Sequence, residues 1–300
     1  MKTLSKKALF IYNPQSGKKK RHSAFPFIVE RLTQLGYQLM IHQLTDFQNI
    51  ETPIKEACQK KWDAIFIAGG DGTVNSSLQT LATEQHRPVI AVIPLGTSNE
   101  FAKYIGMPSQ MEEVFQVIRN GQTKAIDIGK FGDKYFANIA SAGWLSDITY
   151  KTPSYLKAYI GEWAYVFCFL KTFFMSKQSH PISINLPSQE LLSDLSLFLI
   201  MNGNGVGPFE RLIKSNKNRD AHFHLLTCKA SSRAALLLVL LCELLQVPNK
   251  ATIIQHTTIQ TGSFTIPQQI SLNLDGDEHR VKDFQFTVLP RHLQVFTSVG

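Results

Sequence analysis

The sequence has few cysteines and no long hydrophobic run, and these absences exclude several classes of protein. Only four cysteines occur among 300 residues, and they are far apart with no CxxC pair: Cys58, Cys168, Cys228 and Cys242. This pattern is typical of reduced, mostly buried thiols in a cytosolic protein. The most apolar stretch, Ala234–Leu245, is about half the length that spans a bilayer. We therefore expect no transmembrane segment, and we expect any contact with a membrane to be at its surface.

Several familiar signals are also missing. The N-terminus has no long apolar run before a cleavage-like site, so we expect no signal peptide and a cytoplasmic location. The nine histidines show no metal-ligand spacing, which favours structural or surface roles for them. No Gly-x-x-x-x-Gly-Lys-Ser/Thr motif is present, and this excludes a P-loop enzyme.

Basic residues outnumber acidic ones, which gives a formal net charge of +8. That excess suits an anionic partner such as a nucleotide, a nucleic acid or an acidic membrane surface, without choosing among them. The basic run Lys18–His22 fits either a solvated charge cluster or a contact with ATP or anionic lipid headgroups. A hydrophobic content of 44% over this length predicts a well-buried core divided between two domains.

The first 126 residues alternate short apolar runs with amphipathic ones, which predicts a doubly wound parallel sheet. The predicted strands are Ala8–Tyr12, Tyr37–Leu44, Asp63–Ala68 and Val89–Ile93. The predicted helices are Ala24–Leu35, Ile50–Lys61 and one that runs from the glycine-rich turn after the third strand to Ala82.

After Asp127 the pattern changes to short runs of alternating polar and apolar residues, which predicts an antiparallel sheet or β-sandwich. The predicted strands are Ile182–Leu186, Leu195–Met201, His222–Leu226, Thr252–Thr261, Gln269–Leu274 and Leu293–Phe296. Helices are expected at Tyr155–Phe174 and Ala234–Gln246. We therefore predict an α/β domain at 1–126 and a β-rich domain at 127–285, with a tail, 286–300, that can return to the first.

The glycine-rich turn Gly69-Gly70-Asp71-Gly72-Thr73 is the most informative motif, because it follows a buried strand directly and opens a helix. Glycines let the backbone come close to a phosphate, and the free N–H groups of a helix start favour its negative charge. Asp71 would repel a phosphate, so its expected work is to hold Mg²⁺ through water or to order its neighbours. A plain tight turn is the weaker reading, given three glycines in four residues.

Two other strands end in turns of the same character. The first is Asn13-Pro14-Gln15-Ser16-Gly17, and the second is Pro94-Leu95-Gly96-Thr97-Ser98-Asn99, followed by Glu100. Thr97 and Asn99 can bond phosphate or ribose, and Glu100 adds a second carboxylate. Because the carboxyl ends of parallel strands meet at one edge of a sheet, the three turns predict one ligand site there.

With these motifs the chain resembles the diacylglycerol kinase catalytic domain family, which includes bacterial diacylglycerol kinases, YegS-like lipid kinases and sphingosine kinases. The resemblance extends through Ile126-Asp127, Ala142-Gly143, Leu156–Tyr165 and Asp275-Gly276-Asp277, and so covers nearly the whole chain. It implies an ATP-dependent lipid kinase that uses Mg²⁺ and meets its lipid substrate at a membrane surface, peripheral to the membrane and without a nucleic-acid partner. A homodimer is compatible with the sequence and not required by it.

The resemblance also implies which residues form the site. ATP-binding positions carried over by motif are Asn13, Gly69, Gly70, Asp71, Gly72, Thr73, Val74, Asn75, Thr97 and Asn99, with Thr45 matched more weakly. Asp277, assisted by Asp275, is expected to act as general base. A hairpin turn with solvated acids is the other reading of this acidic cluster, since Asp-Gly is a common turn pair.

The sequence departs from the family pattern at three acidic positions. Asp277 stands where Glu is usual, with Glu278 beside it, and Glu100 stands where Asp is usual. Asp127 matches a family Asp expected in an acidic network with Asp71 and residue 100, and a capping role fits it equally well. Asp220 falls where the family has a structural Mg²⁺ site, but Ala221 replaces the glycine that follows. An ordinary loop is the simpler expectation there.

Two other functions remain open from these residues. One is a small-molecule kinase of the NAD kinase type, which also carries Gly-Gly-Asp-Gly-Thr. The other is a non-catalytic nucleotide-binding membrane adaptor, suggested by the departures at Glu100, Asp277 and Ala221. Transfer of the ATP γ-phosphoryl group to diacylglycerol or a related lipid is the leading hypothesis.

Overall fold

The computed structural model describes residues 6–17, 24–44, 49–143, 182–187, 192–202, 221–229, 254–266 and 268–298. The predicted helices 155–174 and 234–246, the basic run 18–22, Thr45 and Asp220 lie outside these residues. Within them, no helix is both long and apolar enough to cross a membrane. Cys58 and Cys228 are buried free thiols, as predicted, and Cys168 and Cys242 lie outside the described part.

The chain divides into two compact units. Unit 1 comprises Met1–Ile128 and Pro290–Gly300, and unit 2 comprises Gly129–Leu289. Two strands, β5 (Thr123–Phe131) and β15 (Phe284–Phe296), contribute residues to both units. The end of the chain therefore belongs to the same unit as its beginning.

Unit 1 is built on a parallel sheet of four strands in the order β4-β3-β1-β2. These strands are β1 (Lys6–Tyr12), β2 (Tyr37–Gln43), β3 (Ala64–Gly69) and β4 (Val89–Pro94). The end of β15 adds a fifth strand beside β4, where Val295 pairs with Ile90. Every residue of β3 is buried, as expected for a central strand that helices cover on both faces.

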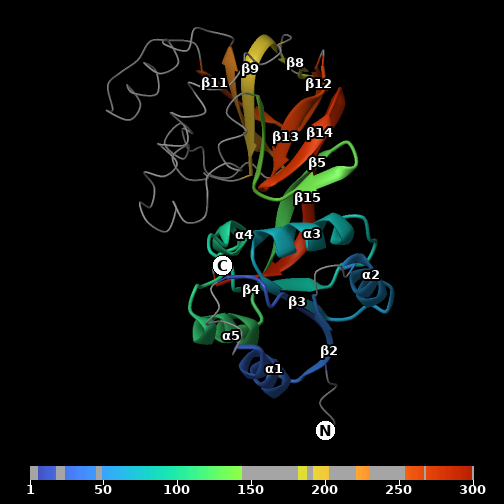
Figure 1. Ribbon diagram of the computed structural model, residues 1–300, viewed down its shortest axis with the longest axis vertical. Coiled ribbons are helices and arrows are strands. Elements are labelled where there is room, and N and C mark those ends of the chain that lie inside the picture. Colours follow the sequence, from blue (N-terminus) through green and yellow to red (C-terminus); the bar gives the residue numbers. More distant parts are fainter. Residues whose placement is uncertain are drawn as a thin grey trace, which may run out of the picture. The chain divides into compact units, whose positions relative to one another are not determined.

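In the described part of unit 1, five helices flank this sheet: α1 (Ala24–Gln34), α2 (Glu51–Gln59), α3 (Asp71–Leu81), α4 (Glu100–Tyr104) and α5 (Met111–Asn120). In Figure 1, α3 and α4 lie on one side of the strands and α1 and α5 on the other. The rings of Phe27 and Phe115, 5.7 Å apart, join α1 to α5. The predicted strands and helices of this part are confirmed, whereas α4 and α5 had not been predicted.

Unit 2 is an antiparallel sheet whose described strands follow the order β14-β13-β7-β9-β8-β12-β15, with β10 between β9 and β11. They are β7 (Ile139–Gly143), β8 (Ile182–Asn185), β9 (Leu192–Met201), β10 (Phe223–Lys229), β11 (Ile254–Ile259), β12 (Thr261–Thr265), β13 (Ile270–Leu274) and β14 (Asp277–Val281). A short strand β6 (Lys134–Phe136) pairs with β5.

The core of unit 2 is rich in phenylalanine. Phe131 contacts four other rings at centroid distances of 4.8 to 5.6 Å, those of Phe136, Phe264, Phe284 and Phe286. Such stacked, tilted and edge-to-face ring pairs add to the stabilisation from burial. An α/β N-terminal part and an antiparallel C-terminal part confirm the predicted fold class.

Candidate functional site

The glycine-rich turn of unit 1 places the start of α3 at the carboxyl end of β3. The strand ends at Gly69, and α3 begins at Asp71 after an extended Gly70 that provides no side-chain cap. The first N–H groups of a helix have no partner within the helix, so this end attracts an anion. The local sequence therefore builds the positive end of a helix dipole at the sheet edge.

Close packing requires glycine at two positions of the site. A Cβ on Gly96 would lie 2.6 Å from the Gly70 Cα, and one on Gly69 would lie 2.7 Å from the Thr73 Cβ. Both distances are far inside van der Waals contact. A Cβ on Gly72, in contrast, would have no neighbour within 4 Å, so packing does not require glycine there. The backbone at Gly72 thus borders open space.

The turn after β1 is hydrogen-bonded to the glycine-rich turn. The Asn13 side-chain Nδ2 donates to Thr73 Oγ1 at 2.8 Å, and Ser16 Oγ accepts from the Gly70 N–H at 3.1 Å. The Asn13 backbone N–H also donates to Ala68 O at 2.9 Å. Two of the three predicted turns are therefore one connected structure.

The turn after β4 closes on itself through Asn99. Its Oδ1 accepts from the Gly96 N–H and its Nδ2 donates to the Gly96 carbonyl, both at 2.9 Å. The backbone of Asn99 has a left-handed conformation, with φ 50°, which asparagine tolerates better than most residues. Its amide shapes the turn and leaves Thr97 exposed beside it.

Asp71 links this third turn to the glycine-rich turn, because its Oδ1 accepts from the Phe101 N–H at 3.3 Å. Burial raises the pKa of Asp71 above its ordinary value, and the nearby Glu100 carboxylate raises it further, against the opposing backbone hydrogen bonds. Glu100 is exposed and pairs with Lys103 at 3.0 Å. The structure thus brings together Asn13, Asp71, Thr73, Thr97, Asn99 and Glu100.

Three other predicted positions of unit 1 have distinct surroundings. Val74 and Asn75 are 3% exposed, so their side chains belong to the interior of the unit. Asp127 accepts a 2.6 Å hydrogen bond at its Oδ1 from the Arg291 N–H, where the backbone of β15 is left-handed. This contact is a capping role of the kind that the sequence allowed.

In unit 2, Asp275-Gly276 forms the two-residue turn of the β13–β14 hairpin. Both residues have positive φ, 50° and 100°, as the tight turns of hairpins require. The Asp275 carboxylate is not merely solvated, because three backbone N–H groups donate to it. These are Ala137 at 2.6 Å, Asn138 at 2.9 Å and Ile139 at 2.8 Å. Asp275 thus fixes the acidic turn to the segment that leads into β7.

Asp277 directly follows this turn and is exposed, paired across the hairpin with Leu274. Its neighbour Glu278 accepts a hydrogen bond from Ser271 Oγ at 2.7 Å, which holds that carboxylate against β13. His279 is close enough for Asp277 to raise its pKa, although burial has the larger effect and lowers it. The hairpin therefore presents Asp277 on a rigid support.

Carboxylate oxygens are the ligands that Mg²⁺ prefers, and it commonly uses one or two of them together with water and phosphate oxygens. Asp71 and Glu100 fit that donor set. Within the described residues, no group of three or more His, Cys, Asp or Glu side chains could hold a metal ion. A fully protein-coordinated metal is therefore not built by this part of the chain.

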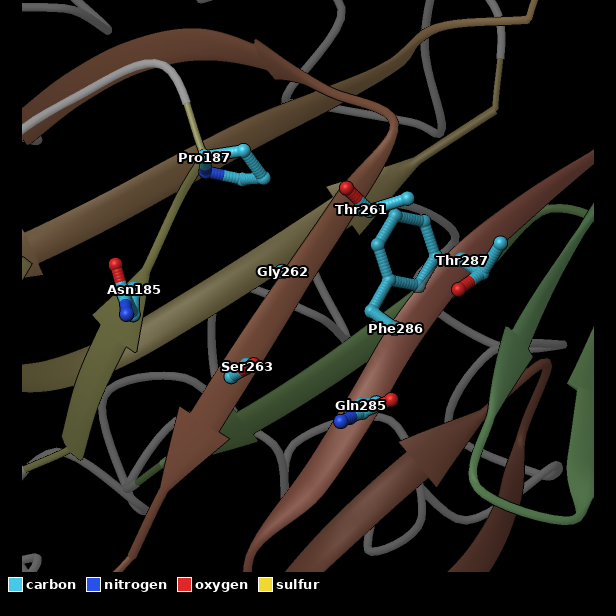
Figure 2. A pocket seen from close by; sticks show the side chains of 8 residues that line it. All are labelled: Asn185, Pro187, Thr261, Gly262, Ser263, Gln285, Phe286 and Thr287. Carbon is cyan, nitrogen blue, oxygen red and sulfur yellow. The ribbon is translucent and has the colours of Figure 1, made fainter.

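A hollow of about 290 Å³ lies elsewhere, on unit 2, and Figure 2 shows β12 between β15 and β8 at this place. Its lining consists of neutral residues: Asn185, Pro187, Thr261, Gly262, Ser263, Gln285, Phe286 and Thr287. None of the predicted site residues lines it, and it offers no charged or acid–base group. It is not the candidate site.

Ser16 and the segment 137–139 were not named as site residues from the sequence. Ser16 lies within the polar turn after the first strand, and its place in that motif could have identified it as a site residue. The three N–H groups that hold Asp275 are more than 130 residues away from it along the chain. No local sequence pattern predicts a contact between residues so far apart.

A parallel sheet whose strand ends form interlinked glycine-rich and polar turns has the architecture of α/β proteins that hold ligands at their strand ends. Residues 7–131 match the model of the diacylglycerol kinase catalytic domain family. A diacylglycerol kinase of Bacillus subtilis is 33% identical over 97% of this chain and 96% of its own. One of Staphylococcus epidermidis is 30% identical over 98% and 93%. The chain belongs to the diacylglycerol kinase family, a family of lipid kinases.

The fold agrees with a solved structure. A crystal structure of a diacylglycerol kinase from Bacillus anthracis superposes with a TM-score of 0.73 and 21% identity, covering 100% of this chain and 99% of that one. The two proteins therefore share the fold of both units, including the antiparallel strands beyond residue 131. The likeness supports the predicted fold class.

Proposed function

We propose that the chain transfers the γ-phosphoryl group of ATP to the hydroxyl of a lipid, diacylglycerol or a close relative, at a membrane surface. The observation that carries the proposal is the bonding of three strand-end turns to one another around the start of α3. Thr73, Gly70 and Asp71 each bond a residue of another turn. A tight turn with only a structural role does not require hydrogen bonds to the two other turns.

The nucleotide half of the chemistry is assigned to unit 1. The N–H groups at the start of α3 bind phosphate oxygens, and the missing side chain of Gly72 lets the phosphates approach the backbone. Asn13 and Thr97 border the same turns and contact ribose or phosphate. Asp71 and Glu100 would hold Mg²⁺, which when bound neutralises charge on the β- and γ-phosphates.

The proton-accepting half is assigned to Asp277 in unit 2. The lipid hydroxyl oxygen forms a bond to the γ-phosphorus while the bond from that phosphorus to the bridging oxygen of ADP breaks. The hydroxyl proton passes to the Asp277 carboxylate, and ADP leaves. Asp275 does not need to accept the proton, because its oxygens already receive three backbone N–H groups. Its role is to hold the turn that carries Asp277.

A kinase assay with a panel of lipids tests the proposal. Purified protein is incubated with γ-labelled ATP, Mg²⁺ and mixed vesicles that contain diacylglycerol, monoacylglycerol or a sphingoid base. We expect label in the organic extract as a phospholipid, and mass spectrometry identifies which lipid carries it. Asp277→Asn should abolish transfer, whereas Glu278→Gln, a matched change at the neighbouring acid, should retain most of it.

Two outcomes would contradict the proposed lipid-kinase activity, and a third would contradict only the role of Asp277. Label that appears in NADP instead of the organic extract indicates a small-molecule kinase. ATP binding without turnover on any lipid indicates a non-catalytic adaptor. Undiminished transfer by Asp277→Asn removes Asp277 as the base and leaves the kinase assignment intact.

A further inference from the structure

Two histidines face each other across the β10–β11 pair of unit 2, and neither has a role in the proposed reaction. His224 is opposite Thr258 and His256 is opposite Leu226, so the two side chains are diagonal neighbours on one face of the ladder. His224 Nδ1 and His256 Nε2 are 3.0 Å apart, and the ring centroids are 5.1 Å apart. The two nitrogens are thus within hydrogen-bonding distance of one another.

The surroundings of both imidazoles disfavour their charged form. Burial lowers the pKa of each ring, and the proximity of His256 lowers that of His224 further. Neutral imidazole is the form that binds transition metals through a ring-nitrogen lone pair. The strands fix both backbones, so little side-chain freedom is lost when a shared ion binds.

The spacing also fits a shared ion. Two nitrogens at normal zinc–nitrogen distance and a tetrahedral angle are about 3.3 Å apart, and the observed 3.0 Å separation is within a small side-chain movement of that value. We propose that His224 Nδ1 and His256 Nε2 form a binding site for one Zn²⁺ or a similar borderline transition-metal ion. Among the described residues, no third His, Cys, Asp or Glu side chain joins the pair.

This site differs in chemistry from the Mg²⁺ positions proposed in unit 1. Imidazole nitrogen suits Zn²⁺, Cu²⁺ and Ni²⁺, whereas Mg²⁺ selects oxygen ligands. Excess Mg²⁺ should therefore fill the carboxylate site without displacing Zn²⁺ from the histidine pair. The bound ion would cross-link β10 to β11 and make the stability of unit 2 depend on the metal.

Calorimetric titration of the metal-free full-length protein with Zn²⁺, in excess Mg²⁺, tests the proposal. We expect one Zn²⁺ per chain in the wild type, and a loss of affinity of at least about tenfold in His224→Gln and in His256→Gln. His222→Gln is the matched control. That ring directly precedes β10 and interacts at 3.5 Å with Gln260, and its removal should change the affinity less than about twofold.

Imidazole nitrogen NMR identifies the ligating atoms. Zn²⁺ should shift the Nδ1 resonance of His224 and the Nε2 resonance of His256, and leave His222 unchanged. A saturating ion should also raise the thermal midpoint of the wild type by a few degrees and that of His256→Gln by none. Zn²⁺ binding that is equal in the wild type and both pair variants, or imidazole signals that do not move, would show an ordinary hydrogen bond between the rings and overturn the proposal.

Discussion

Replacing Asp275 by Asn should destabilise unit 2 strongly, because the carboxylate receives three backbone N–H groups. Oδ1 accepts from Asn138 and Ile139, and Oδ2 accepts from Ala137. Asparagine keeps one acceptor oxygen, and its amide NH₂ group faces at least one of these donors. Asparagine also tolerates the left-handed backbone at this position, so the change tests the hydrogen bonds and not the turn.

The magnitude follows from these contacts. Ala137 and Asn138 are buried, at 0% and 6% exposure, so water can replace the lost acceptor only in part. A hydrogen bond to a charged group contributes about 1.5–3 kcal/mol, and an unpaired buried donor costs about 1–3 kcal/mol. We expect the free energy of unfolding of unit 2 to fall by about 3–5 kcal/mol, a large share of the usual stability of a domain.

Asp277→Asn is the matched control, two residues further on. Asp277 is exposed, so its replacement should change the free energy of unfolding by less than about 0.5 kcal/mol while abolishing phosphoryl transfer. Urea denaturation followed by circular dichroism measures the first effect, and the lipid-kinase assay measures the second. Equal stability losses in the two variants, or native stability in Asp275→Asn, would refute the assignment of Asp275 to structure and Asp277 to catalysis.

Three further predictions concern unit 1. Gly96→Ala should lower the thermal midpoint, because its Cβ would lie 2.6 Å from the Gly70 Cα at a cost of about 1–3 kcal/mol. Gly72→Ala has open space around the new Cβ, so it should leave the midpoint nearly unchanged and weaken ATP binding measured by calorimetry. Ser16→Ala should raise the KM for ATP about tenfold through loss of the Gly70 contact, while Gln15→Ala, at an exposed neighbouring position, should not; equal KM values would contradict it. Asp71→Asn should abolish activity yet match or exceed wild-type stability at pH 7, since a raised folded pKa means that ionisation of Asp71 opposes folding above its ordinary pKa. That advantage should shrink in thermal unfolding below the ordinary pKa of aspartate, and a clear loss of stability at pH 7 would contradict the reasoning.

The sheet of unit 1 could be predicted because its signals are local. A continuous apolar run such as Ala64–Ala68 followed by Gly69-Gly70 predicts a buried strand and a turn within one short window. The helix α5 carried a comparable signal, with Val114, Val117 and Ile118 on one buried face and Gly121 as a left-handed end. That periodicity is visible in the sequence, and α5 was nevertheless missed.

The candidate site was predicted less completely than the fold, for a physical reason. The motifs identify which residues gather at the strand ends, but the hydrogen bonds that connect the turns join residues 30 to 60 positions apart. The division of work between Asp275 and Asp277 depends on N–H groups from a segment more than 130 residues earlier. Only the folded chain shows that one of these acids is held by the backbone while the other is exposed.

The return of β15 to unit 1 has a consequence for how the protein is made. Val295 pairs with Ile90, and the Thr297 N–H donates to Gln122 O, so the sheet of unit 1 lacks a strand until these residues have left the ribosome. By then all of Gly129–Leu289 has been synthesised. Unit 1 begins to form first and is completed last, so the edge of β4 that β15 later covers is exposed throughout translation of unit 2.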